Sequence, residues 1–203
     1  MPNRQIVKKN GWQRIINILF VIALLFIATL LVMPSFKSTV LQGLMKIGLF
    51  KPKNESVMKA DRPTHAPLSH ISFRDQDNRI VNLGDLKGKV IFINFWATWC
   101  PPCIAEMPSL QNLYNMKKQD EELVFLFVET DGNLKKAIKF MNKNQYDLPT
   151  YTPNSPIPAD LLGSTIPTTV ILNKSGEIAF KHEGMADYSH PDATRLLDKL
   201  KAQ

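Results

Sequence analysis

Two cysteines, Cys100 and Cys103, are the only ones in this chain of 203 residues, and they stand three positions apart. They follow a β-branched and aromatic run at residues 90–96 and precede apolar residues at helical spacing in 102–116. The pair is therefore expected where a buried strand leads into a helix. The unpaired N–H groups and the dipole at a helix start stabilise a thiolate, and cysteine pKa values in such motifs fall from about 8.5 to between about 3.5 and 7.5. The pattern favours reversible disulfide chemistry, with Cys100 attacking and Cys103 resolving the mixed disulfide.

Two other interpretations of the cysteine pair stay open on spacing alone. The pair could form half of a zinc site, although the sequence has no second such pair and its histidines show no ligand spacing (His65, His70, His182 and His190). It could also be an inert structural disulfide, although so short a loop removes little entropy from the unfolded chain. The intervening Pro101 and Pro102 suit a helix start, because the N–H groups they lack would have no helical partner, and they stiffen the loop.

The segments around the pair alternate between strand-like and helix-like patterns. Residues 75–78 form a turn-rich tetrapeptide between two short strand-like runs, and residues 173–176 read as a second hairpin turn. Strands are expected at 70–74, 79–83, 90–96, 123–128, 168–172 and 177–181, and helices at 102–116, 134–144 and 193–200. This order predicts an α/β domain with a mixed central sheet and helices on both of its faces.

Residues 95–103 read Phe-Trp-Ala-Thr-Trp-Cys-Pro-Pro-Cys and closely resemble the active-site segment of thioredoxin-fold proteins. More narrowly, they resemble the membrane-anchored thiol–disulfide oxidoreductases of the TlpA/ResA type. The sequence Ile-Pro-Thr-Thr at residues 166–169 matches the cis-proline loop of that family, and the resemblance covers about residues 64–203. It implies a thioredoxin fold, in which Pro167 is cis and lies opposite Cys100.

The same resemblance implies which residues contact a substrate. The backbone of Ile166 is expected to pair with a substrate strand beside Pro167, and Trp99 to shield the cysteines and contact partners. Pro101 and Pro102 complete the expected contact surface. No separate cofactor is implied, because the Cys100–Cys103 disulfide itself carries the electrons. The proline-containing segment 145–163 looks like a family insertion that either shapes the substrate groove or crosses the surface.

An acidic residue near the cysteines is a further candidate. Thioredoxin has a buried aspartate six residues before its first cysteine, and this chain has Asn94 there, so no acid at that position can transfer a proton to Cys103. Glu106, three residues after Cys103, matches an acidic position of the ResA-type branch. As an anion near the sulfurs it would raise their pKa values and carry a proton. Alternatively, it is an ordinary first-turn glutamate favoured by the helix dipole.

The formal net charge of +7 is unevenly distributed. Residues 1–59 hold nine basic residues and one acidic residue, which leaves 16 of the 25 basic and 17 of the 18 acidic residues for positions 60–203. The folded part is therefore close to neutral, and nucleic acid is not an expected partner. The hydrophobic share of 44% is sufficient for a packed core, which excludes a wholly disordered chain.

Residues 15–33 contain no charged residue and would span about 28 Å as a helix, close to the hydrocarbon thickness of a bilayer. Basic residues precede the run, which predicts a single-pass signal anchor with residues 1–14 in the cytoplasm and the rest outside. A soluble core helix, a cleaved signal peptide and a lipoprotein are the alternatives; the run has neither a clean cleavage site nor a cysteine after it. Residues 34–63 are expected to be a spacer, with an amphipathic stretch near 40–50, and residues 64–203 the thioredoxin-like domain.

Together these observations predict a thiol–disulfide oxidoreductase on the extracytoplasmic face of the inner (cytoplasmic) membrane. It would reduce disulfides of substrate proteins and be recharged by a membrane protein that donates electrons through a dithiol. The family resemblance includes a role in cytochrome c maturation. The same fold working as a thiol oxidase or a general oxidative-stress reductase is the first alternative, and a metal-binding or adaptor module is the second.

Overall fold

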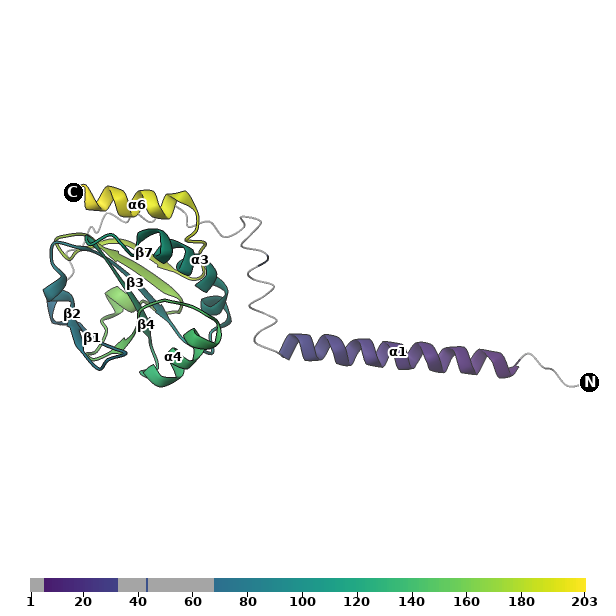
Figure 1. Ribbon diagram of the computed structural model, residues 1–203. Helices are drawn as coiled ribbons and strands as arrows, with labels where there is room; N and C mark the ends of the chain where they lie inside the picture. Colours follow the sequence, from purple (N-terminus) through teal and green to yellow (C-terminus); the bar gives the residue numbers. More distant parts are fainter. Residues whose placement is uncertain (1–5, 33–42, 44–67) are drawn as a thin grey trace, which may run out of the picture.

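The structure is a computed structural model that describes residues 6–32, 43 and 68–203 (Figure 1). Except for Gly43, the predicted spacer 34–63 and its amphipathic stretch lie outside the described residues, as do the first four positions of the predicted domain. The described elements after residue 67 form one folded unit around a single sheet.

The N-terminal helix α1 runs over Ile6–Val32 and is about 40 Å long at 1.5 Å per residue. Its window Gly11–Ala28 has a mean hydropathy of 1.9, and none of it is buried, unlike the helix of a soluble core. Among the described residues this is the one helix long and apolar enough to cross a membrane. The helix therefore fits a single-pass membrane anchor, and it begins earlier than the predicted span of 15–33.

The sheet of the folded unit has seven strands among the described residues, in the order β2-β1-β5-β4-β3-β6-β7. β3 pairs in parallel with β4, and β4 with β5, whereas the other neighbours are antiparallel. The strands are β1 (Ser72–Asp75), β2 (Ile80–Asn82), β3 (Val90–Trp96), β4 (Leu123–Glu129), β5 (Thr150–Pro153), β6 (Thr168–Leu172) and β7 (Ile178–Glu183). The mixed sheet predicted from the sequence is confirmed.

Every residue of the central strand β3 is buried, because apolar side chains cover both faces of the sheet. Phe92 belongs to the cluster on one face and Ile93 to the cluster on the other, as alternation along a strand requires. The first cluster also contains residues of α3 (Pro101–Lys117), α4 (Leu134–Lys143) and α6 (Pro191–Lys201), and the second contains Leu161 of α5 (Ala159–Leu162). Two short 3-10 helices, Leu68–His70 and Leu83–Leu86, add Leu68 and Leu83 to the second cluster.

The order of the strands explains which helix covers which face. β3, β4 and β5 are parallel neighbours, and the chain passes from one to the next in a single direction across the sheet. The connections between parallel strands are right-handed, so the two helices in these connections, α3 and α4, lie on the same face of the sheet. From β5 the chain returns past β4 and β3 to β6, and the helix on this return, α5, packs on the opposite face. This return brings the C-terminal end of α5 next to the start of β6.

The segment 145–163, expected to be a family insertion, is where the sequence-based assignment of strands and helices is incomplete. It contains β5, which lies between β4 and the β1–β2 hairpin and joins that hairpin to the sheet. β5 is only four residues long, follows Pro149 and ends at Pro153. It is therefore too short, and too closely flanked by prolines, to be recognised as a strand in the sequence. Its alternating burial shows the half-buried pattern of a sheet strand.

The aromatic packing on the α3 side of the sheet gives a first test. Phe92 is 1% exposed, and its ring contacts those of Phe125, Phe127 and Tyr188 at centroid distances of 5.4, 6.3 and 5.5 Å. We expect Phe92→Ala to lower the free energy of unfolding by about 3–5 kcal/mol, measured by urea denaturation of the full chain in detergent. The exposed Met116 is the control, and Met116→Ala should stay within about 0.5 kcal/mol of the parent. Equal effects of the two substitutions would contradict the assignment of this core.

Candidate active site

The two cysteines lie at the junction between β3 and α3. Cys100 is the N-cap residue of α3 with extended backbone angles, and Pro101 and Pro102 occupy the first helical turn. The backbone N–H of Cys103 points at Sγ of Cys100 at 3.2 Å. A sulfur at this position receives an N–H group that the helix leaves unpaired, which is the geometry that stabilises a thiolate.

The two sulfur atoms are joined in a disulfide, with a Cα–Cα distance of 5.3 Å. Both residues are buried, at 3% exposure for Cys100 and 0% for Cys103, but only Cys100 lines the groove described below. The described residues contain no group of three or more His, Cys, Asp or Glu side chains that could hold a metal ion. The two cysteines thus differ in access, as an attacking and a resolving thiol must.

The loop before β6 faces Cys100. The peptide bond between Ile166 and Pro167 is cis, as the family resemblance implied. Sγ of Cys100 lies 3.8 Å from the carbonyl oxygen of Ile166. Because a disulfide sulfur carries no proton, this is a contact rather than a hydrogen bond in the oxidised protein. It shows that the cis-proline loop and the first cysteine share one site.

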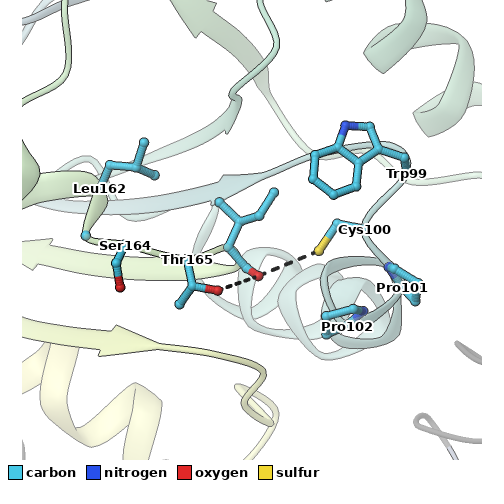
Figure 2. A pocket seen from close by; sticks show the side chains of 9 residues that line it. Trp99, Cys100, Pro101, Pro102, Leu162, Ser164 and Thr165 are labelled. Atoms are coloured by element: carbon cyan, nitrogen blue, oxygen red, sulfur yellow. Dashed lines mark hydrogen bonds between the residues drawn. The ribbon is translucent and has the colours of Figure 1, made fainter.

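A groove of about 440 Å³ opens over Cys100. Figure 2 shows Leu162, Ser164 and Thr165 on one side of it and Trp99 on the other, with Sγ of Cys100 between them. The groove residues are Trp99, Cys100, Pro101, Pro102, Leu162, Gly163, Ser164, Thr165 and Ile166. Five of the predicted site residues therefore lie in one groove, with Pro167 directly after its last lining residue. The groove also includes Leu162 and Gly163, so segment 145–163 shapes it as well as crossing the sheet.

Glu106 lies away from the groove, in the interior of the protein. It is the sixth residue of α3, beyond the first turn, and 0% exposed, so the alternative of an ordinary first-turn glutamate is wrong. Its Oε1 accepts a hydrogen bond of 2.8 Å from Nδ2 of Asn94, and its Oε2 accepts one of 3.3 Å from the backbone N–H of Ala186. Cys103 and Glu106 are three residues apart on α3 and both are fully buried, so they lie on the same face of this helix.

Burial raises the pKa of Glu106 from 4.5 to about 8, because the charged carboxylate loses its water, while the hydrogen bonds from Asn94 and Ala186 act in the opposite direction. The Asn94 side chain also donates a hydrogen bond of 3.0 Å to Oγ1 of Thr169, which fixes its orientation between β3 and β6. The asparagine that replaces thioredoxin's aspartate thus holds the acid that α3 supplies. A carboxyl with this pKa changes protonation near neutral pH.

One residue of the site was missed in the sequence. The indole N–H of Trp99 donates a hydrogen bond of 2.7 Å to Oδ2 of Asp131, which follows β4. Trp99 is 58% exposed, so this bond fixes a side chain that packing alone would leave free to rotate. In the sequence, the one indication was that Asp131 comes shortly after the strand-like run 123–128. In the structure this run, β4, pairs in parallel with β3. Strands paired in this way end at the same edge of the sheet, where the cysteine pair also lies.

These features define the class of the protein. A mixed sheet, a cysteine pair at the start of a helix and a cis-proline loop facing the first cysteine together make a thioredoxin fold with a dithiol–disulfide centre. The Redoxin family model matches residues 59–197, about two thirds of the chain. The chain therefore belongs to the Redoxin family, as a TlpA/ResA-like thiol–disulfide oxidoreductase.

Individual relatives agree with this assignment. The thiol-disulfide oxidoreductase ResA of Oceanobacillus iheyensis is 34% identical over 158 residues, which cover 70% of this chain and 77% of that protein. ResA of Bacillus subtilis is 36% identical over 107 residues, which cover 51% of this chain and 58% of that protein. The chain is thus an oxidoreductase similar to these proteins, and its predicted enzyme class is confirmed.

Solved structures show the same fold. The exposed lipoprotein thioredoxin Etrx1 of Streptococcus pneumoniae is 25% identical, with a TM-score of 0.50 over 65% of this chain and 98% of that chain. The thioredoxin domain of a thiol-disulfide oxidoreductase from Bacteroides vulgatus is 22% identical, with a TM-score of 0.54 over 67% of this chain and 99% of that chain. The second likeness concerns the fold alone.

The raised pKa of Glu106 predicts how stability depends on pH in the oxidised protein, which has no thiol to titrate. Between about pH 4.5 and 8 the unfolded chain loses this proton while the folded protein keeps it, so the free energy of unfolding falls as pH rises. We expect a loss of about 3 kcal/mol between pH 6 and pH 9 that is absent in Glu106→Gln, measured by urea denaturation of the full chain in detergent.

Glu129 provides the matched control for this measurement. It is also a buried glutamate with a raised pKa, caused first by desolvation, but it belongs to β4 and accepts a hydrogen bond from Asn133. Glu129→Gln should therefore retain the part of the pH dependence that comes from Glu106. A Glu106→Gln variant with the pH dependence of the parent would contradict the assignment.

Proposed function

We propose that the chain reduces disulfides of substrate proteins on the extracytoplasmic side of the membrane, using Cys100 and Cys103. One observation carries this proposal: Cys100 lines an open groove, whereas Cys103 is 0% exposed behind it. A substrate disulfide can reach only the first sulfur, and only the second is protected from reacting with a substrate directly. This asymmetry supports the order of the two exchange steps.

In the reduced enzyme, the Cys100 thiolate attacks one sulfur of the substrate disulfide. The substrate S–S bond breaks, its other sulfur leaves as a thiolate, and a mixed disulfide with Cys100 forms. Cys103 then loses its proton and attacks Sγ of Cys100, which releases the second substrate thiolate and forms the Cys100–Cys103 disulfide. The substrate gains two electrons, its two thiolates take up two protons, and the enzyme is oxidised by the same two electrons.

Glu106 is proposed to accept the proton of Cys103. Its position on the same face of α3 supports this role, as does its pKa of about 8, which lies close to that of a thiol. Asn94 keeps the carboxyl in place through the 2.8 Å hydrogen bond. Because Glu106 is buried, its charge would also act on the sulfurs with little screening by solvent, and its ionised form would raise their pKa values.

The groove is proposed to bind an extended segment of the substrate. The backbone of Ile166 beside cis-Pro167 would pair with this segment, and Trp99, Pro101 and Pro102 would contact it around Cys100. No separate cofactor enters this scheme, because the Cys100–Cys103 disulfide carries the electrons. The enzyme must then be reduced again, which requires a dithiol donor, and a membrane protein suits an anchored enzyme.

The proposed location rests on the N-terminal charges. Residues 15–33 would form a single-pass anchor in the inner (cytoplasmic) membrane, with residues 1–14 in the cytoplasm and the domain 64–203 on the periplasmic side. Reduction of apocytochrome c cysteines before haem attachment is proposed as the specific role, because the resemblance to the TlpA/ResA type implies it. The alternative is the same chemistry in the oxidising direction or against oxidative stress. The reduction potential decides between them, since 30 mV is about 1.4 kcal/mol.

Trapping of the mixed disulfide tests the order of attack. We expect Cys103→Ser to accumulate an intermolecular disulfide between Cys100 and its substrate at a level at least about tenfold above the parent, because the resolving thiol is absent. The measurement is non-reducing electrophoresis of membranes followed by identification of the linked protein. Cys100→Ser is the control and should trap little, because Cys103 is buried. More trapping through Cys103 than through Cys100 would reverse the assigned roles.

Labelling with a membrane-impermeant maleimide tests the orientation. In a Cys100→Ser, Cys103→Ser background, Met116→Cys would place one thiol on the domain at a side chain that is 56% exposed. We expect this thiol to be labelled in intact spheroplasts, and a thiol introduced by Asn3→Cys to be labelled only after lysis. The opposite pattern would place the domain in the cytoplasm.

A further inference from the structure

One wall of the groove is formed by residues 162–166, which connect α5 to β6. α5 has a single turn, Ala159–Leu162, and Leu161 is its one fully buried residue. A helix this short makes few hydrogen bonds of its own, so contacts with its surroundings must hold it in place. Residues 162–166, here called the groove wall, must therefore be held in position by side chains from other elements.

Lys181 of the edge strand β7 binds the backbone of α5. Its Nζ donates hydrogen bonds of 3.0 Å to the carbonyl oxygen of Ala159 and 2.9 Å to that of Asp160. The carbonyl of Ala159 also accepts the backbone N–H of Gly163 at 2.9 Å, so Lys181 adds a second hydrogen bond there and provides one at the carbonyl of Asp160. Lys181 therefore ties the end of β7 to the element that leads into the groove wall.

Glu183, two residues further along β7, binds the groove wall itself. Its Oε2 accepts hydrogen bonds from the backbone N–H and from Oγ of Ser164, at 3.4 and 3.2 Å. At Gly163, where φ is +76°, a Cβ atom would lie 2.3 Å from Oε1 of Glu183. Only glycine allows the carboxylate to approach the wall this closely and also adopts this backbone conformation readily.

Lys181 and Glu183 act as one pair. They are two positions apart on β7, so their side chains project from the same face of the sheet. In the register they lie opposite Val170 and Thr168 of β6. Nζ of Lys181 and Oε1 of Glu183 are 3.6 Å apart. Val170 belongs to the same cluster as Leu161, which confirms that this is the face on which α5 packs. The pair thus links the C-terminal hairpin to the groove wall, whose Leu162, Ser164 and Thr165 lie across the groove from Trp99 (Figure 2).

We propose that Lys181 and Glu183 are positioning residues that hold the groove wall beside Cys100 and thereby determine how a polypeptide substrate binds. This inference rests on the proposed function and adds a substrate preference to it. None of the nine residues that line the groove is charged, so the segment it accepts is an extended one with uncharged residues next to the reactive cysteine. Lys181 and Glu183 do not line the groove and act through the backbone of residues 159–164.

The test compares a protein disulfide with a small one, using the full chain in detergent. Turnover of the protein disulfide is measured with dithiothreitol as the reductant. The small disulfide, which dithiothreitol reduces directly, is measured with pre-reduced enzyme from which dithiothreitol has been removed. The probes are bovine insulin and 5,5′-dithiobis(2-nitrobenzoate). For Glu183→Ala and Lys181→Met we expect the KM for insulin to rise at least fivefold with kcat within twofold of the parent. The ratio of kcat/KM for insulin to the second-order rate constant for the small disulfide should fall by the same factor, because a small disulfide contacts less of the wall.

Two kinds of control separate positioning from general damage. Glu183→Gln keeps an acceptor oxygen for Ser164, and it should recover most of the KM lost in Glu183→Ala. Glu177→Ala and Lys174→Met change charged side chains of the same β6–β7 hairpin that bind Asn173 and Glu122, away from the groove, and should leave KM unchanged. Near-ultraviolet circular dichroism and thermal unfolding establish that each variant is folded.

The outcomes are distinguishable. If the parent reduces neither probe, the proposed function fails and the inference fails with it. If the parent reduces insulin but Glu183→Ala and Lys181→Met have its KM, the inference alone is wrong. A loss of kcat for insulin and of the rate constant for the small disulfide by the same factor, without recovery in Glu183→Gln, would also overturn the inference, because it indicates damage to the cysteine site instead of to the groove wall.

Discussion

The junction between β3 and α3 is the constraint on which the rest of the site depends. β3 is buried along its whole length, so its end cannot shift without disturbing the packing on both faces of the sheet. The helix that follows therefore begins at a fixed place, with Cys100 as its N-cap and the N–H group of Cys103 directed at the Cys100 sulfur. A reactive sulfur is thus held close to the end of a fully buried strand.

The two sides of this junction have opposite properties. Toward the groove, Cys100 meets the cis-proline loop and an uncharged surface that a polypeptide can cover. Toward the interior, Cys103 and Glu106 share a buried face of α3, where desolvation raises the pKa of the carboxyl to about 8. The proposed substrate binding and the proposed proton transfer would therefore be separated by the first turns of one helix, and each would depend on a different group of neighbours.

The strand β5 explains how the fold builds the groove. β5 pairs with β4 on the side away from β3, whereas β6 pairs with β3. The chain must therefore return across the sheet from β5 to β6, and it does so over the face opposite α3. That return carries α5 and the groove wall to the cysteine site, where the hydrogen bonds of Lys181 and Glu183 hold them. A segment that looks irregular in the sequence thus supplies a strand of the sheet and one wall of the groove.

The resemblance to the TlpA/ResA type implied that Pro167 is cis. Local patterns in the sequence determined much of the rest: the long apolar helix, the buried strands at 90–96 and 123–128, and the cysteine pair at a helix start. These features depend on residues that are neighbours along the chain. Only the tertiary structure decided the burial of Glu106, the bond between Trp99 and Asp131, and the contacts of Glu183 with Ser164. Each of these joins residues brought together by strand order and crossovers, and the free energy of burying or pairing a polar group depends on neighbours that no local pattern records.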